Sequence, residues 1–165
     1  MTRALALAAL AVAVLAVGGC STLTVEPGLT ADEATTQTGA LVDDAVSAID
    51  ESTIERVDQV KDESAPCYSP QADSDGSIVY WENRQYLWLV DGADPLDELD
   101  GVVEQLVDAG ARLTYDSESE GTREVQLSSG GDSLPVYIVS VSAAPAGSAP
   151  AVINVSATSP CFETK

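Results

Sequence analysis

The sequence lacks histidine and has few basic residues. Lysine and arginine number 7 among 165 residues, against 27 aspartates and glutamates, so the formal net charge is −20 at pH 7. Proteins that bind nucleic acids need clustered Lys and Arg to neutralise phosphates, so this composition argues against a nucleic-acid partner. The lack of histidine excludes imidazole catalysis and histidine metal ligands. A chain of this length fits one domain.

Paired carboxylates are the catalytic groups that remain available, and enzymes that cleave glycosides use such pairs. With so many acidic residues some pairs approach by chance, and no spacing singles out one pair. We therefore expect a non-enzymatic protein with no catalytic residue, no metal and no cofactor. A carboxylate-pair hydrolase stays as an alternative.

The first twenty residues have the pattern of an export signal. Arg3 precedes an apolar run over 4–17, and small residues follow. As a helix this run would rise only about 21 Å, short of the roughly 30 Å hydrocarbon core of a bilayer. The four residues Val17-Gly18-Gly19-Cys20 resemble the lipobox of bacterial lipoproteins. An ordinary secretory signal with a chance cysteine is the other interpretation.

The lipobox resemblance implies that Cys20 carries a diacylglyceryl group and that the signal is cut just before it. We then expect a signal peptide at 1–19, a lipidated tether at 20–29 and a single domain at 30–165. Two fatty chains such as palmitate would hold the protein firmly, whereas one chain holds only marginally. The expected location is the outer face of the cytoplasmic membrane, with the acidic domain repelled by anionic lipids and standing off the bilayer.

Two cysteines remain for the mature domain, Cys67 and Cys161, and each follows a proline. In an exported chain, two cysteines most simply form one disulfide. Separate buried thiols, or one reactive thiol, are the alternatives. A disulfide would leave no free thiolate to act as a nucleophile.

Capping residues and periodicity predict two helices. Thr30 and Glu33 form a capping box, and apolar or small residues then recur at gaps of three and four, so we expect one helix that Pro66 stops. The acidic residues of 43–63 would form its solvated face. Asp94 and Pro95 begin a second helix, which Gly110 ends.

Strands are expected on either side of the second helix. The segment 78–90 is rich in β-branched and aromatic residues and has a polar centre at 82–85. We favour one long strand over a hairpin at Asn83-Arg84, because no glycine marks a two-residue turn. Short alternating segments between 111 and 157 indicate the remaining strands. The expected fold is α+β, a two-layer sandwich of order α-β-α-β-β-β, with a mostly antiparallel four-stranded sheet and helices on one face.

The tryptophan-bearing strand, the segment Asp108-Ala109-Gly110-Ala111 and the closing Ser159-Pro160-Cys161 are similar to those of small cell-envelope lipoproteins of high-GC Gram-positive bacteria. Members of that group mostly have no assigned activity, so the resemblance implies a location and a fold rather than a chemistry.

Three aromatic residues, Trp81, Tyr86 and Trp88, are the candidate binding surface. On an alternating strand Trp81 faces one side and the other two face the opposite side. One side would pack in the core, and the other could be exposed to a partner. We expect the protein to bind an envelope protein or a wall component. The alternative is a carrier of a small apolar ligand or lipid in a helix–sheet cleft.

Overall fold

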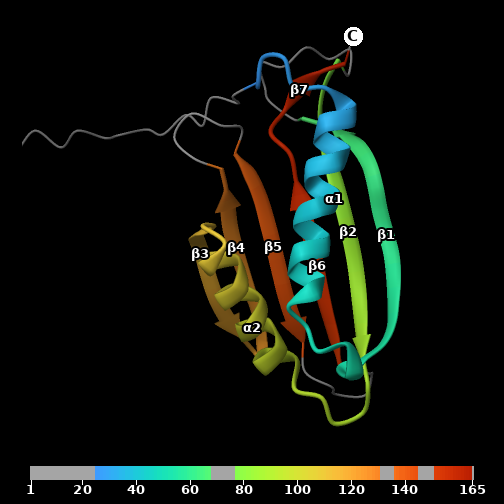
Figure 1. Cartoon of the computed structure of the whole chain (residues 1–165), viewed down its shortest axis with the longest axis vertical. Coiled ribbons are helices and arrows are strands. Elements are labelled where there is room, and N and C mark those ends of the chain that lie inside the picture. The colour runs from blue at the N-terminus through green and yellow to red at the C-terminus, as the bar shows by residue number, and fades with distance from the viewer. Residues whose placement is uncertain (1–24, 68–76, 131–135, 145–150, 165) are drawn as a thin grey trace, which may run out of the picture.

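The computed structural model describes residues 25–67, 77–130, 136–144 and 151–164. Its centre is a seven-stranded antiparallel sheet, with strand order β1-β2-β6-β5-β4-β3 and with β7 paired to the start of β2. Two helices lie over one face of this sheet (Figure 1). The strands are β1 (Ile54–Pro66), β2 (Ile78–Leu89), β3 (Arg112–Ser119), β4 (Thr122–Ser129), β5 (Tyr137–Ala144), β6 (Val152–Thr158) and β7 (Phe162–Glu163).

Helix α1 (Ala31–Ser47) begins at the predicted capping box. The Glu33 amide donates to the Thr30 hydroxyl, and the Glu33 carboxylate accepts from the Thr30 amide at 3.0 Å. Helix α2 (Pro95–Asp108) begins after Asp94, whose carboxylate accepts from the Leu96 amide at 2.9 Å. The starts of both helices and the extent of α2 confirm the sequence predictions.

The core fills the layer between the helices and the sheet. Strands β5 and β6 alternate, with one side chain buried against the helices and the next turned to the other face. Leu99 and Val102 of α2 and Val42 of α1 are fully buried against these strands. Burying such a side chain contributes roughly 1.5–3 kcal/mol relative to leaving it exposed, so this layer is the main source of stability.

The prediction of one helix running from Thr30 to Pro66 is wrong. Helix α1 ends at Ser47, and a short 3₁₀ turn (Glu51–Thr53) leads into β1. Asp50 sets this turn, because its carboxylate accepts from the Ser52 amide at 2.9 Å and its carbonyl accepts from the Thr53 hydroxyl. Residues beyond the turn form an edge strand along β2, and that pairing outweighs their helix-like spacing.

The predicted fold class is also wrong. The protein is mostly β, with seven strands in one antiparallel sheet and two helices among the described residues, where a four-stranded α+β sandwich of order α-β-α-β-β-β was expected. Three strands make up the difference. They are β1, whose polar composition does not mark a strand of 13 residues, the two-residue β7, and a fourth strand after α2 where three were expected. The prediction that 78–90 forms one strand rather than a hairpin is confirmed by β2.

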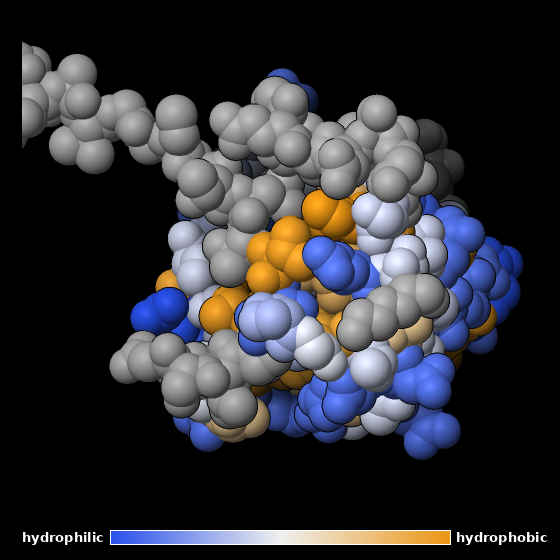
Figure 2. Space-filling model, turned by 90° about the horizontal axis from the view of Figure 1, so that it is seen from above, coloured by the Kyte–Doolittle hydropathy of each residue, from blue (hydrophilic) through white to orange (hydrophobic). Residues whose placement is uncertain are grey.

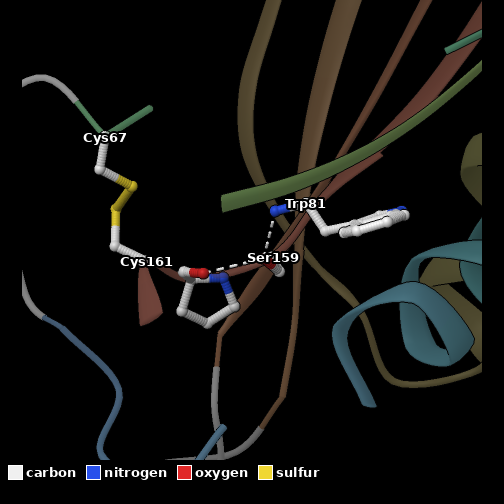
Figure 3. Close-up of a disulfide and its surroundings, with 5 residues drawn as sticks. Cys67, Trp81, Ser159 and Cys161 are labelled. Atoms are coloured by element: carbon white, nitrogen blue, oxygen red, sulfur yellow. Dashed lines mark hydrogen bonds between the residues drawn. A yellow bond between two sulfur atoms is a disulfide. The ribbon is translucent and has the colours of Figure 1, made fainter. Parts of the chain in front are cut away.

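The predicted disulfide is confirmed. Cys67, just after β1, is bonded to Cys161, just before β7, with 6.2 Å between the two Cα atoms. Close by, the Trp81 amide of β2 donates to the Ser159 hydroxyl at 2.9 Å (Figure 3). The disulfide and this hydrogen bond hold the end of the chain to one end of the sheet.

Candidate functional site

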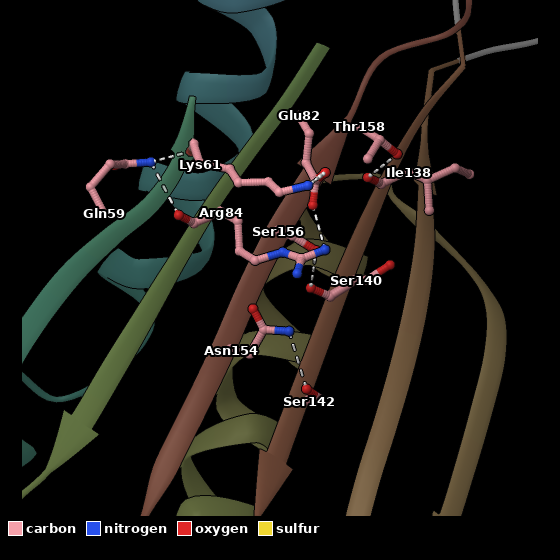
Figure 4. A network of polar contacts seen from close by, with 10 residues as sticks. All are labelled: Gln59, Lys61, Glu82, Arg84, Ile138, Ser140, Ser142, Asn154, Ser156 and Thr158. Atoms are coloured by element: carbon pink, nitrogen blue, oxygen red, sulfur yellow. Dashed lines mark hydrogen bonds and ion pairs between the residues drawn. The ribbon is translucent and has the colours of Figure 1, made fainter. Parts of the chain in front are cut away.

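The sheet face that turns away from both helices is here called the open face. It is formed by alternate residues of the strands, which the cross-strand register identifies. In β5 and β6 the positions on the helix side are apolar, whereas the centre of the open face is polar (Figure 4). An antiparallel sheet that packs against the core with one face and meets solvent with the other shows this alternation of apolar and polar residues along each strand.

An ion-pair cluster lies on β1 and β2. Lys61 Nζ is 3.0 Å from one carboxylate oxygen of Glu82, and the Arg84 guanidinium pairs with the other. The Glu82 side chain is only 4% exposed, while Lys61 and Arg84 are about one-third exposed at 36% and 33%. The hydrogen bond and the charge of Glu82 raise the pKa of Lys61. Since both oxygens of Glu82 contact cations, this carboxylate is an ion-pairing group rather than a free acid or nucleophile.

Two bulges in β1 decide which of its side chains reach the open face. The register shifts between Ile54 and Arg56, and again between Gln59 and Lys61. Between the two shifts the alternation moves by one residue, which places Arg56 and Asp58 on the open face. Regular alternation with Lys61 would have placed Val57 there.

Arg56, Asp58 and Trp88 form an aromatic corner beside this cluster. The Trp88 indole N–H donates to the Asp58 carboxylate at 2.8 Å, and the Arg56 guanidinium lies 4.9 Å from the centre of the Trp88 ring. Arg56 also pairs with Asp58 at 3.1 Å. A cation over an indole face contributes roughly 0.5–1 kcal/mol at an exposed site, and it adds to the hydrogen bond with Asp58 in favouring this orientation of Trp88. Tyr86 is opposite Asp58 in the register and lies on the same face.

Small polar side chains cover the middle of the open face, on β5 and β6. They make long hydrogen bonds to one another: Ser156 donates to the Ser140 carbonyl at 3.4 Å, and Asn154 donates to the Ser142 hydroxyl at 3.4 Å. These distances exceed the usual 2.7–3.2 Å, so the contacts are weak. Among the described residues, three buried side-chain atoms have no hydrogen-bond partner: Asn154 Oδ1, Arg84 Nε and Glu82 Oε1. Glu82 Oε1 contacts Arg84 as an ion pair. Ser140, Ser142 and Thr158 are half-buried and Ser156 is buried. A hydroxyl that is half-buried can still accept or donate a further hydrogen bond.

Charge is distributed unequally between the two sides of the sheet. Four of the five described basic residues lie on the open face, together with five carboxylates, so this face is close to neutral. The remaining 19 described carboxylates lie elsewhere, with Arg123 as the one other described base. The basic residues of the open face are Arg56, Lys61, Arg84 and Arg112, and the carboxylates are Asp58, Glu63, Glu82, Glu124 and Glu163.

The three aromatic residues of the predicted binding surface are divided between the faces, as strand alternation requires. Tyr86 and Trp88 lie together on the open face. Trp81 lies on the helix side, where it packs against Val79 and Phe162 and donates from its indole N–H to Asp62 at 2.8 Å. The structure therefore brings two of the three together.

Sequence reasoning missed Arg56, Lys61, Arg84 and Asn154. The first two were assigned to a helix, and no binding motif marked Arg84 or Asn154. The serines and threonines that alternate with buried valines in β5 and β6 were the available signal. The predicted lipidation site, Cys20, lies outside the described residues.

Two hollows lie at the end of the domain that carries the disulfide. One, of about 740 Å³, lies between the segment Val25–Ala31 and β7, and the other, of about 590 Å³, reaches Tyr137. Burial of Tyr137, and then the nearby charges of Glu33 and Glu26, raise its pKa. No cluster of three or more metal-ligating residues occurs among the described residues, and no described helix is long and apolar enough to cross a membrane.

Comparisons of the chain with protein-family models, with curated proteins and with solved structures give no match. The geometry of the open face is therefore the basis for assigning a class of function. This face is polar and nearly neutral, and it belongs to a seven-stranded sheet whose other face packs against the helices.

Proposed function

We propose that the protein is a lipid-anchored envelope protein on the outer face of the cytoplasmic membrane, and that it binds a protein or wall component through its open face. The anchor rests on the lipobox resemblance at Cys20, and the disulfide fits an oxidising compartment outside the cytoplasm. The role is non-enzymatic, with no metal or cofactor.

The observation that carries the binding role is the charge balance of the open face. A partner in the envelope approaches a chain whose other surfaces are strongly acidic, and repulsion disfavours contact of those surfaces with anionic polymers or proteins. The open face avoids this repulsion. It also offers Trp88 and Tyr86 for stacking and the hydroxyls of β5 and β6 for hydrogen bonds.

The anchor is tested by replacing Cys20 with alanine and fractionating cells. We expect the parent protein in the membrane fraction and the variant in the soluble extracytoplasmic fraction. Unchanged membrane association of the variant would contradict the lipid anchor.

The open face is tested with a matched pair of substitutions. Ser142→Arg places a large cation in the middle of the face, and Thr36→Arg makes the same chemical change on the exposed side of α1. Binding is measured by co-sedimentation with isolated cell walls and by crosslinking to envelope proteins. We expect Ser142→Arg to reduce binding at least tenfold and Thr36→Arg to leave it near the parent value. Equal binding by both variants would contradict the assignment of the open face.

A carrier role is the second candidate, and the hollow beside β7 is the observation that favours it. Val25, Leu29 and Phe162 contribute apolar surface to that hollow. The helix–sheet layer, where the sequence suggested a cleft, is instead filled by fully buried side chains such as Leu87, Leu99 and Val155. Extraction of the purified protein with organic solvent, followed by mass spectrometry, would detect a bound lipid.

A further inference from the structure

The segment just after the expected lipidation site is part of the folded domain. Val25 forms a parallel bridge with Cys161, and the Glu26 amide donates to the Cys161 carbonyl at 2.8 Å. Leu29 packs against the cluster of Ala34, Val79 and Phe162. The chain is therefore fixed to the domain from Val25 onward. Only the four residues 21–24 separate this point from Cys20, so the two are five residue steps apart.

The attachment point is itself held from two directions. Cys161 is bonded to Cys67 at the end of β1, and the following strand β7 is paired with the start of β2. A force on the tether is thus transmitted from Val25 to the sheet through the Cys67–Cys161 disulfide and through the pairing of β7 with β2. All these elements lie at one end of the sheet, where β7 and the start of α1 are found (Figure 1).

We infer that this end of the domain, formed by Val25–Ala31, β7 and the disulfide, faces the lipid bilayer and that the strands point away from it. The inference rests on the proposed lipid anchor at Cys20. Five extended residues span at most about 18 Å, so Val25 lies within that distance of the anchored cysteine. Strand β1, with 13 residues, carries the opposite end of the sheet roughly 43 Å further.

Part of the described surface at this end is apolar. Figure 2, which looks onto it, shows apolar surface with polar surface to its right and below it. Val136, at the start of β5, is 45% exposed here. Exposed carboxylates of Asp32, Glu33 and Glu163 also lie at this end, so anionic headgroups repel it as they repel the acidic helices. The short tether, rather than charge, is what holds this end toward the bilayer.

An end-on arrangement determines which surfaces a partner can reach. The open face stands along the membrane normal, so the bilayer does not cover it. The connections at Ser47–Thr53 and Val90–Asp94 lie farthest from the bilayer (Figure 1). A partner in the wall therefore meets these connections first and the open face beside them.

The test measures how far each end of the lipidated, full-length protein lies from a vesicle surface. Asp32→Cys places a thiol at the start of α1, and Asp91→Cys places one at the opposite end; both positions are exposed, and both changes remove one carboxylate. Each thiol receives a fluorescent donor, and the acceptor is a labelled lipid in vesicles of phosphatidylglycerol and phosphatidylethanolamine. The dye pair has a Förster distance near the length of β1, roughly 40 Å.

We expect energy transfer from position 32 to exceed that from position 91 several-fold. Equal transfer from both positions on vesicle-bound protein means that the domain lies flat, on its helices or on the open face, and overturns the orientation alone. If the protein carries no lipid and does not float with the vesicles, that result overturns both the orientation and the proposed anchor.

A longer tether provides the matched control. Twenty Gly/Ser residues inserted before Val25 leave the domain unchanged and give a flexible tether with an average span of roughly 25–30 Å. We expect the difference between the two positions to shrink in this variant. If the difference is unchanged, the short tether does not set the orientation and the inference is overturned.

Discussion

The disulfide is expected to stabilise the domain more than most single features of the sheet. It joins residues separated by 94 positions, and it links the end of β1 to β7. Replacing both Cys67 and Cys161 with alanine removes the cross-link without leaving a thiol. In the chain-entropy description, closing a loop of about 100 residues contributes about 4.7 kcal/mol, and measured losses are typically about 2–5 kcal/mol. The long loop places our expectation at about 3–5 kcal/mol.

Equilibrium unfolding in urea, followed by tryptophan fluorescence, measures this loss. Trp81 and Trp88 lie on opposite faces of β2, so the signal reports the helix side and the open face together. The unfolded chain expands when the bridge is absent, and we therefore also expect a larger dependence of the unfolding free energy on urea.

The parent protein in reductant is the control for this experiment. Cys67 is buried, so alanine also removes a little packing, and the double variant should be slightly less stable than the reduced parent. A difference below about 1 kcal/mol between the oxidised parent and the double variant would refute the reasoning, since it would show that the bridge does not restrict the unfolded chain.

Three further changes test other parts of the structure. Glu82→Gln leaves two partly exposed cations without their carboxylate, so we expect the unfolding free energy, measured in urea, to fall by about 1–2 kcal/mol. The control is Glu63→Gln, at the exposed position opposite Glu82 on β1, which should lower it by less than about 0.5 kcal/mol. Equal losses would contradict the role of the cluster. Leu99→Ala empties a fully buried site of α2 and should lower the unfolding free energy by about 2–5 kcal/mol; a change under about 1 kcal/mol would contradict the packing described. The hydrogen bond from Arg123 lowers the pKa of Asp116, so its stabilising effect is present above the unfolded-state pKa near 4 and is lost as the pH falls through the lower folded-state pKa. Asp116→Asn should remove up to about 1 kcal/mol at pH 7 and make the acid limb of the pH–stability curve shallower, and an unchanged limb would count against the pair.

Local signals predicted those elements that are set by nearby residues. The Thr30–Glu33 box and the Asp94–Pro95 start lie at the helix ends where they were expected, because capping is satisfied within one turn. The disulfide followed from cysteine count and compartment, which do not depend on topology.

The first strand could not be predicted in this way. Its residues bury little surface, so no apolar alternation marks it, and Val57 and Val60 happen to fall at helical spacing. Strand β1 forms because its backbone pairs with β2 at the edge of the sheet. Its two bulges then decide which of its side chains lie on the open face. Edge pairing and bulge positions are properties of the assembled sheet. The periodicity of the sequence therefore could not predict that Arg56, Asp58 and Trp88 lie together.

The composition of the open face limits the kind of partner that it can have. In β5 the buried positions are Tyr137, Val139, Val141 and Ala143, while Ser140 and Ser142 alternate with them on the open face. A face that was permanently covered by an apolar partner would favour large apolar residues, since each contributes stability on burial. Small hydroxyl side chains gain less from such burial. Ser140 and Ser142 are half-buried, and they can exchange water for a partner's polar groups with little net change in hydrogen bonding. This face is therefore suited to a polar partner that binds and dissociates, rather than to a permanent subunit interface.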